Sequence, residues 1–170
     1  CEFCVQARAK GTRHFQVKPM ERPTGPVAEF DYTFWSHKGY GPELEDDRAV
    51  TSLSGICRAT GSPFASVVLR QGPWPFIVAL LAKWVKELGN NPQTLRGDSE
   101  NALQAMLRSV ASHVEEETPS LKVFVESSPA HSHQSIGGAE KYHDTLVGMV
   151  RTIIAVIRWH TGYLVEPGST

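Results

Sequence analysis

Residues 27–35 of the sequence read VAEFDYTFW, a stretch rich in β-branched and aromatic side chains. Proline and glycine residues flank the stretch on both sides, so the pattern predicts a β-strand from Val27 to Trp35. Asp31 lies in the middle of this strand, where an unpaired charge is costly to bury. Asp31 is therefore either a solvent-facing strand residue or a carboxylate with a chemical role.

Downstream of this strand, extended and helical patterns alternate along the chain. Further β-like stretches are predicted at Ala49–Cys57, Phe64–Arg70, Gln93–Gly97 and Leu121–Glu126, and the first two form a hairpin. Apolar residues at helical spacing predict helices at Trp74–Leu88, Leu103–Val114 and about Gly138–His160. The order of three strands, helix, strand, helix, strand, helix predicts an α/β fold with a mixed sheet of about five strands flanked by helices. It is the order of ribonuclease-H-like folds.

Composition limits the classes of protein to which the chain can belong. The 170 residues suffice for one domain with a sizeable core, and 41% hydrophobic with 21% charged residues is ordinary globular composition. The longest apolar run, Ile77–Ala82, is far shorter than the roughly 20 residues of a membrane span, and no signal peptide opens the chain. Three cysteines form no even disulfide framework. We expect an intracellular protein, nuclear or cytoplasmic, with no membrane partner.

The first 26 residues differ in composition from the rest. They combine a Cys-x-x-Cys pair, several basic residues and three prolines, which predicts a tail plus linker. A core at 27–162 and a carboxy-terminal tail at 163–170 follow. The basic arm suits a phosphate backbone, although a short basic stretch is more often only solvated. Because the chain opens with Cys1 rather than Met, we expect it to be a fragment of a longer protein.

Two further carboxylates stand at the starts of predicted helices. Asp98 lies at the junction between the strand Gln93–Gly97 and the next helix, and taken alone this position predicts a helix N-cap. Glu140 lies in the first turn of the last helix, where the helix dipole favours an acid. Considered alone, Asp98 and Glu140 are each explained by a role at the start of a helix. Only their occurrence together with Asp31 indicates a functional site.

The three segments together resemble the catalytic core of retroviral and retrotransposon integrases, in the same order over most of the chain. Asp31 in a first strand is similar to the first acid of that family, and Asp98 after a short strand is similar to the second. The most specific motif is Gln134-Ser135-x-Gly137-x-x-Glu140, which Lys141 and Leu146 follow. It resembles the sequence around the catalytic Glu of the family.

The resemblance implies DNA strand transfer, which means processing of element 3′ ends and their joining to target DNA. It implies Asp31, Asp98 and Glu140 as catalytic residues and as ligands of two Mg²⁺ (or Mn²⁺) ions. Carboxylate oxygens are ligands that Mg²⁺ prefers, and two ions about 3.5–4 Å apart act on the attacking and leaving oxygens. A homo-oligomer in the complete protein is also implied. DNA contacts are implied for Lys10, Arg13, Gln134, Lys141 and Arg151.

The amino terminus is similar to the same family. Cys1-x-x-Cys4, followed by Lys10, Gly11 and Arg13, resembles the end of a His-His-Cys-Cys zinc module. A tetrahedral structural Zn²⁺ needs four ligands, so Cys1 and Cys4 are half a site. We expect them to bind Zn²⁺ only with a His pair upstream of this chain. Cys57, in a predicted strand, is expected to be an ordinary buried thiol.

Three departures from the family pattern leave other functions open. Asp98 and Glu140 are separated by 41 residues, more than is usual, Ile136 replaces a usual Asn, and Asp144 stands where a basic or amide residue is common. One alternative is an inactive or domesticated integrase-derived module that binds DNA or another partner. The other is a ribonuclease H or transposase of the same fold. Arg151 and Arg158 near Asp144 either contact DNA or only solvate the helix.

Overall fold

The computed structural model describes residues 26–36, 39–40, 50–128 and 137–163. Its strands are β1 (Val27–Ser36), β2 (Gly39–Tyr40), β3 (Val50–Cys57), β4 (Pro63–Val68), β5 (Gln93–Gly97) and β6 (Val123–Ser127). Its helices are α2 (Pro75–Glu87), α3 (Asn101–Glu117) and α4 (Gly137–Thr161). Every predicted strand and helix is present, and the α/β class is confirmed.

The sheet is mixed, with the strand order β4-β3-β1-β5-β6, and the short β2 pairs with one end of β1. β1 runs antiparallel to β3 and parallel to β5, and β5 runs parallel to β6. The predicted hairpin of β3 and β4 turns at Gly61, whose φ of 71° is a left-handed conformation that glycine adopts without strain. This mixed sheet of five main strands, flanked by helices, is consistent with the predicted ribonuclease-H-like fold.

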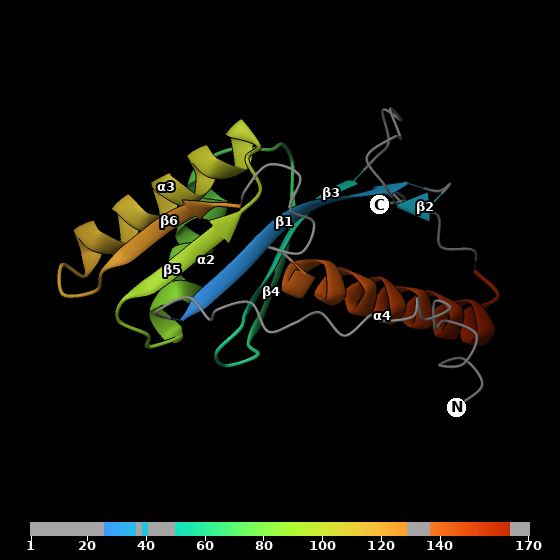
Figure 1. The fold of residues 1–170 in the computed structure, drawn as a ribbon. Coiled ribbons are helices and arrows are strands. Elements are labelled where there is room, and N and C mark those ends of the chain that lie inside the picture. The colour runs from blue at the N-terminus through green and yellow to red at the C-terminus, as the bar shows by residue number, and fades with distance from the viewer. Residues whose placement is uncertain (1–25, 37–38, 41–49, 129–136, 164–170) are drawn as a thin grey trace.

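The two faces of the sheet have different characters, and the reason is the period of two along β1. Ala28, Phe30 and Tyr32 point to one face and join the hydrophobic core under α2 and α3. Phe30 packs edge-on against Trp84 of α2, with ring centroids 5.8 Å apart. The alternate residues Glu29, Asp31 and Thr33 point to the opposite face, which is polar and carries α4. Figure 1 shows α2 and α3 together on one side and α4 on the other.

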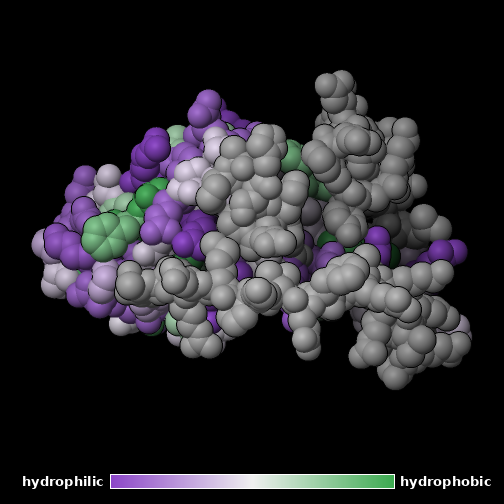
Figure 2. Space-filling view, viewed as in Figure 1, coloured by the Kyte–Doolittle hydropathy of each residue, from purple (hydrophilic) through white to green (hydrophobic). Residues whose placement is uncertain are grey.

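α4 crosses only part of its face of the sheet, because its contacts are with β1 and β3. In Figure 1 the neighbouring β5 and β6 lie to one side of α4. Figure 2 shows that the described surface on this side is mainly hydrophilic, with a small hydrophobic patch over β6, whose Phe124 is exposed. In the described ranges, no helix has both the length and the apolar character to span a membrane.

Replacing Leu103 in the core by alanine should lower the free energy of unfolding by about 2–5 kcal/mol, because its fully buried side chain would leave a cavity between α3 and the sheet. Urea unfolding of the two chains measures the difference. Leu69→Ala is the control, since Leu69 is 80% exposed, and it should change stability by less than about 0.5 kcal/mol. Equal losses in the two variants would contradict this assignment of the core.

Candidate active site

A row of charged side chains crosses the α4 face of the sheet, and we call it the charge row: Arg58, Glu29, Arg96 and Glu126. The strand register sets Glu29 beside Arg96, and Arg96 beside Glu126, while Arg58 follows the end of β3. Arg58 Nε lies 2.9 Å and Arg96 Nη1 4.0 Å from Glu29 Oε1. Arg96 Nη2 lies 2.8 Å from Glu126 Oε2. The signs alternate along the row, so each charge has an opposite neighbour.

Glu29 also attaches α4 to the sheet. Its side chain is fully buried, and its Oε2 accepts a hydrogen bond of 3.0 Å from the backbone N–H of Gly138 in the first turn of α4. Burial raises the pKa of the Glu29 carboxyl, and Arg58, the Gly138 N–H, Arg96 and the Ala139 N–H act in the opposite direction. Oε1 faces Arg58 but makes no hydrogen bond of ordinary geometry with the described residues.

Asp31 and Asp98 belong to the next row along the same face. Asp31 pairs with Ser54 of β3, and its side chain is 25% exposed. Asp98 directly follows β5 and comes two residues after Arg96, just as Asp31 comes two residues after Glu29. The paired part of this ladder ends at Glu29 and Arg96, and the same register extended by two residues would bring Asp98 next to Asp31. Because neighbouring strands are about 4.7–4.9 Å apart, we expect these two carboxylates to be neighbours.

The position of Asp98 alone predicted an N-cap for α3, but Asp98 does not cap this helix. The N-cap residue is Glu100, and Asp98 Oδ1 instead accepts the backbone N–H of Glu100 at 3.0 Å. Gln104 Nε2 of α3 donates to the backbone oxygen of Asp98 at 2.7 Å. Burial and the nearby Asp98 raise the pKa of Glu100, whose carboxylate accepts a hydrogen bond from Gln71. Asp98 is therefore held in the strand-to-helix connection and lies half-buried at its surface.

Glu140 lies in the first turn of α4, two residues after Gly138. The side chain of this third predicted carboxylate lies outside the described part of the chain. Among the side chains that the structure does describe, no group of three His, Cys, Asp or Glu residues is placed to hold a metal ion. The backbone of Glu140 is nevertheless close to the charge row, because the Gly138 N–H contacts Glu29.

His143 is a site residue that sequence reasoning missed. It lies on α4, and its Nε2 is within hydrogen-bonding reach of the hydroxyls of Thr33, at 2.7 Å, and of Ser54. Its Nδ1 lies 3.9 Å from Asp31 Oδ2. Burial lowers the pKa of His143, and Asp144 opposes this shift. The available signal was its spacing, since His143 is three residues after Glu140 and four after the buried Ala139.

The predicted DNA-contacting residues fall into two groups. Lys141 and Arg151 lie on α4 and are exposed. Lys10, Arg13 and Gln134 lie outside the described residues, as do the predicted zinc ligands Cys1 and Cys4. Cys57 is a buried free thiol, as predicted.

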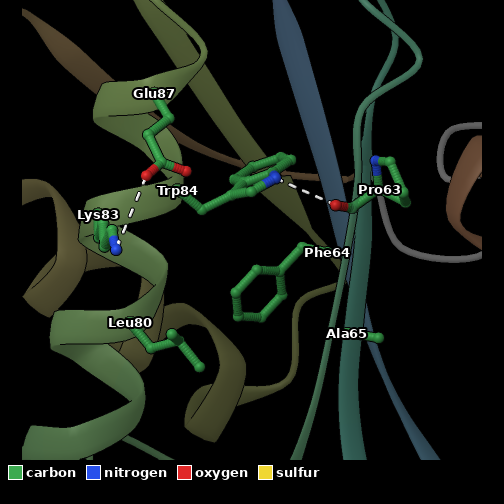
Figure 3. Close-up of a pocket in the computed structure, with 7 residues that line it drawn as sticks. All are labelled: Pro63, Phe64, Ala65, Leu80, Lys83, Trp84 and Glu87. Carbon is green, nitrogen blue, oxygen red and sulfur yellow. Dashed lines mark hydrogen bonds and ion pairs between the residues drawn. The ribbon is translucent and has the colours of Figure 1, made fainter.

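A groove between β4 and α2 lies on the opposite side of the sheet from the carboxylates. Pro63, Phe64 and Ala65 line it from the strand, and Leu80, Lys83, Trp84 and Glu87 line it from the helix (Figure 3). The indole Nε1 of Trp84 donates to the Pro63 oxygen at 3.1 Å, and Lys83 pairs with Glu87 at 3.9 Å. The charged groups that line this groove are thus paired with each other, and its walls are mostly apolar side chains.

The mixed five-stranded sheet with helices on both faces is an α/β fold that is consistent with the ribonuclease-H-like class. A cryo-EM structure of the simian T-cell lymphotropic virus intasome in complex with PP2A regulatory subunit B56 gamma is similar to it, with a TM-score of 0.55 and 13% sequence identity. The match covers 95% of this chain and 52% of the other, so this chain spans about half the length of its structural neighbour. No protein-family model and no curated protein matches the sequence. The likeness therefore shows a shared fold.

Replacing Glu29 by glutamine tests the electrostatics of the charge row. Because the folded-state pKa of Glu29 is raised above 4.5, ionising it costs stability as pH rises above 4.5 through that raised pKa. Glutamine carries no such cost. The stability of Glu29→Gln minus that of the wild type should therefore increase with pH over this window and then level off, as measured by urea unfolding at a series of pH values. A difference that falls with rising pH would mean that the arginines and N–H groups outweigh burial.

Proposed function

We propose that this chain is the catalytic core of an integrase-type enzyme that processes DNA 3′ ends and joins them to target DNA. The observation that carries the proposal is the parallel pairing of Glu29 with Arg96, because the same register extended by two residues would bring Asp31 and Asp98 together on the polar face of the sheet. The first turn of α4, which contains Glu140, is hydrogen-bonded to the same face. The fold of the intasome neighbour supports this choice among nucleic-acid enzymes.

The donor groups suit two Mg²⁺ or Mn²⁺ ions, because Asp31, Asp98 and Glu140 supply carboxylate oxygens, the ligand type that Mg²⁺ prefers. When bound, such a pair activates the attacking oxygen and stabilises the leaving oxygen of a phosphodiester. Asp31, in the central strand, would serve both ions, with Asp98 completing one site and Glu140 the other. Glu29 is a poor ligand by comparison, since it is fully buried and its charge already faces Arg58 and Arg96.

Other residues of the polar face would orient these ligands. The pKa of His143 is lowered, so near neutral pH its imidazole is uncharged. It lies beside Asp31 but does not neutralise the charge of that carboxylate, which a metal ion would do. Gln104 and the Glu100 N–H hold the backbone and one oxygen of Asp98. The two contacts to Asp98 restrain that acid before any ion or DNA arrives, which reduces the entropy lost on binding.

The reaction itself needs no covalent enzyme intermediate. In end processing, a water oxygen forms a bond to phosphorus while the bond from phosphorus to the 3′ oxygen breaks, which leaves a 3′ hydroxyl. In joining, that hydroxyl attacks a target phosphodiester, and the displaced 3′ oxygen takes up a proton. Because the atoms attacked belong to the backbone, we expect DNA to be held mostly by its phosphates.

The substitutions Asp31→Asn, Asp98→Asn and Glu140→Gln should each lower strand transfer by about a thousandfold or more, because each keeps the shape of the side chain and removes a metal-binding charge. Combining them should add little further loss, since the three act as one unit. Strand transfer by this chain is measured on short DNA duplexes with Mg²⁺ or Mn²⁺. Circular dichroism checks that each variant is folded.

Asp144→Asn is the matched control, because Asp144 is an exposed acid one turn after Glu140 on the same helix. It should retain most of the activity. A triad variant that stays active would remove that residue from the proposed site. Cleavage of an RNA–DNA hybrid without strand transfer would instead identify the ribonuclease H alternative, and a folded wild type with neither activity would identify an inactive module.

DNA binding by this chain alone should be weak and should fall steeply with salt, because few cations contact the phosphates. In the double variant Lys10→Gln/Arg13→Gln, the slope of log K against log salt concentration should become shallower by about two, since each phosphate contact contributes about 0.9. Fluorescence anisotropy with a labelled duplex measures both slopes. Lys83→Gln, on the far side of the sheet, should leave the slope unchanged, and binding that ignores ionic strength would contradict a phosphate-led interface.

A further inference from the structure

We infer that Glu29 and Gly138 are positioning residues that determine where the first turn of α4, and with it Glu140, stands over Asp31 and Asp98. The inference rests on the proposed function for its chemical consequence, but the anchor itself is a structural feature of this chain. Neither residue is one of the three acids, and Gly138 is not the glycine of the Gln134-Ser135-x-Gly137-x-x-Glu140 motif.

The side chain of Glu29 is fully buried. Bringing a carboxylate out of water costs several kcal/mol unless charges and hydrogen bonds replace the lost hydration. Here the replacements come from three segments: Arg58 after β3, Arg96 on β5 and the N–H groups of Gly138 and Ala139 on α4. The start of a helix presents unpaired N–H groups and a positive dipole end, which suit a carboxylate. Any displacement of the α4 start therefore removes part of this compensation.

Gly138 permits a close approach between the backbone of α4 and the Glu29 carboxylate. A Cβ built at Gly138 would lie 2.5 Å from Glu29 Oε2 and 3.3 Å from Arg58 Nε. Although Oε2 is the end of a side chain, that side chain is fully buried and faces two arginines, so it has little room to move. At Gly137, by contrast, a Cβ would meet nothing within 4 Å. The contact with Glu29 therefore requires glycine at 138 and not at 137.

The contact between Glu29 and Gly138, which we call the anchor, is linked to the proposed metal site through the first turn of α4. Gly138 and Glu140 are in the same helical turn, so a shift of the anchored N–H moves the backbone of Glu140 by a similar amount. Metal ligands tolerate little displacement, and loss of the groups that orient them typically weakens metal affinity by about 10–100-fold. Glu29 and Gly138 would thus act on the metal through Glu140, without touching it.

A double-mutant cycle on the full chain tests this inference. Gly138→Ala inserts a methyl group against Glu29 Oε2, and Glu29→Asp withdraws the carboxylate by one methylene, so the double variant has room for the methyl. Mn²⁺ binding, read from the electron paramagnetic resonance signal of free Mn²⁺, reports the site. Amide hydrogen exchange at residues 138–140 reports the anchor. Gly137→Ala is the matched glycine control, and Val147→Ala, a buried position further along α4, is the control for general loosening of the helix.

Each single variant should weaken Mn²⁺ binding by about tenfold or more and speed exchange in the first turn of α4. The double variant should bind no more weakly than the worse single variant, because the two changes act on one contact. Gly137→Ala and Val147→Ala should bind Mn²⁺ within about twofold of the wild type, although Val147→Ala lowers the unfolding midpoint.

Two results would overturn the positioning role while leaving the proposed function intact: wild-type Mn²⁺ affinity in folded Gly138→Ala, or an equal loss of affinity in Val147→Ala. A different result would refute the proposed function, namely a wild-type chain that binds no Mn²⁺ or that binds it unchanged after Asp31→Asn. The positioning role would fall with it. If the proposed function fails, amide hydrogen exchange still tests the anchor, because unchanged exchange at residues 138–140 in Gly138→Ala would reject it.

Discussion

The buried carboxylate of Glu29 is the constraint on which the polar side of this molecule depends. It sits in the central strand, receives the Gly138 N–H from α4 and faces Arg58 and Arg96 from the two neighbouring strands. Since an uncompensated carboxylate is costly to bury, these partners must be present together. One side chain thereby determines where α4 meets the sheet and which sheet residues lie beneath its first turns.

One face of the sheet supplies the stability of the fold, and the other carries the acids of the proposed site. On one face Phe30, Trp84 and the residues around them form an apolar core under α2 and α3, where close packing supplies the stability. On the other face the same strand presents Glu29, Asp31 and Thr33 to α4. This face is held by ion pairs and hydrogen bonds, whose geometry is directional. Directional contacts suit a site whose acids must have a defined arrangement. Because the core lies on the other face, a substitution among these acids does not require substitutions in the core.

Fold and function rest on different observations in this protein. The intasome neighbour shares the fold at 13% identity, and a likeness at that level speaks for architecture only. The proposed activity comes instead from this chain's own residues: Asp31 and Asp98 in continued register, and Glu140 in a helical turn attached to the same face. His143 joins α4 to the same face through the hydroxyls of Thr33 and Ser54, and its Nδ1 lies 3.9 Å from Asp31 Oδ2.

Local patterns in the sequence determined the elements, because hydrophobic period and breaker residues act over a few residues. The strand Gln93–Gly97 was predicted with its observed bounds, and the helix Trp74–Leu88 within one residue of α2 at each end. The order of the three acids along the chain can also be read from the sequence, and their role as a triad stays a prediction. Only the tertiary structure decided which groups meet, because partners such as Glu29 and Gly138 are 109 positions apart in the chain. The N-cap role that its position alone predicted for Asp98 is not observed, because α3 begins after Glu100 and Asp98 Oδ1 accepts the Glu100 N–H. The sheet-facing side of α4, with Ala139, His143 and Val147, was likewise set by the polar surface beneath it.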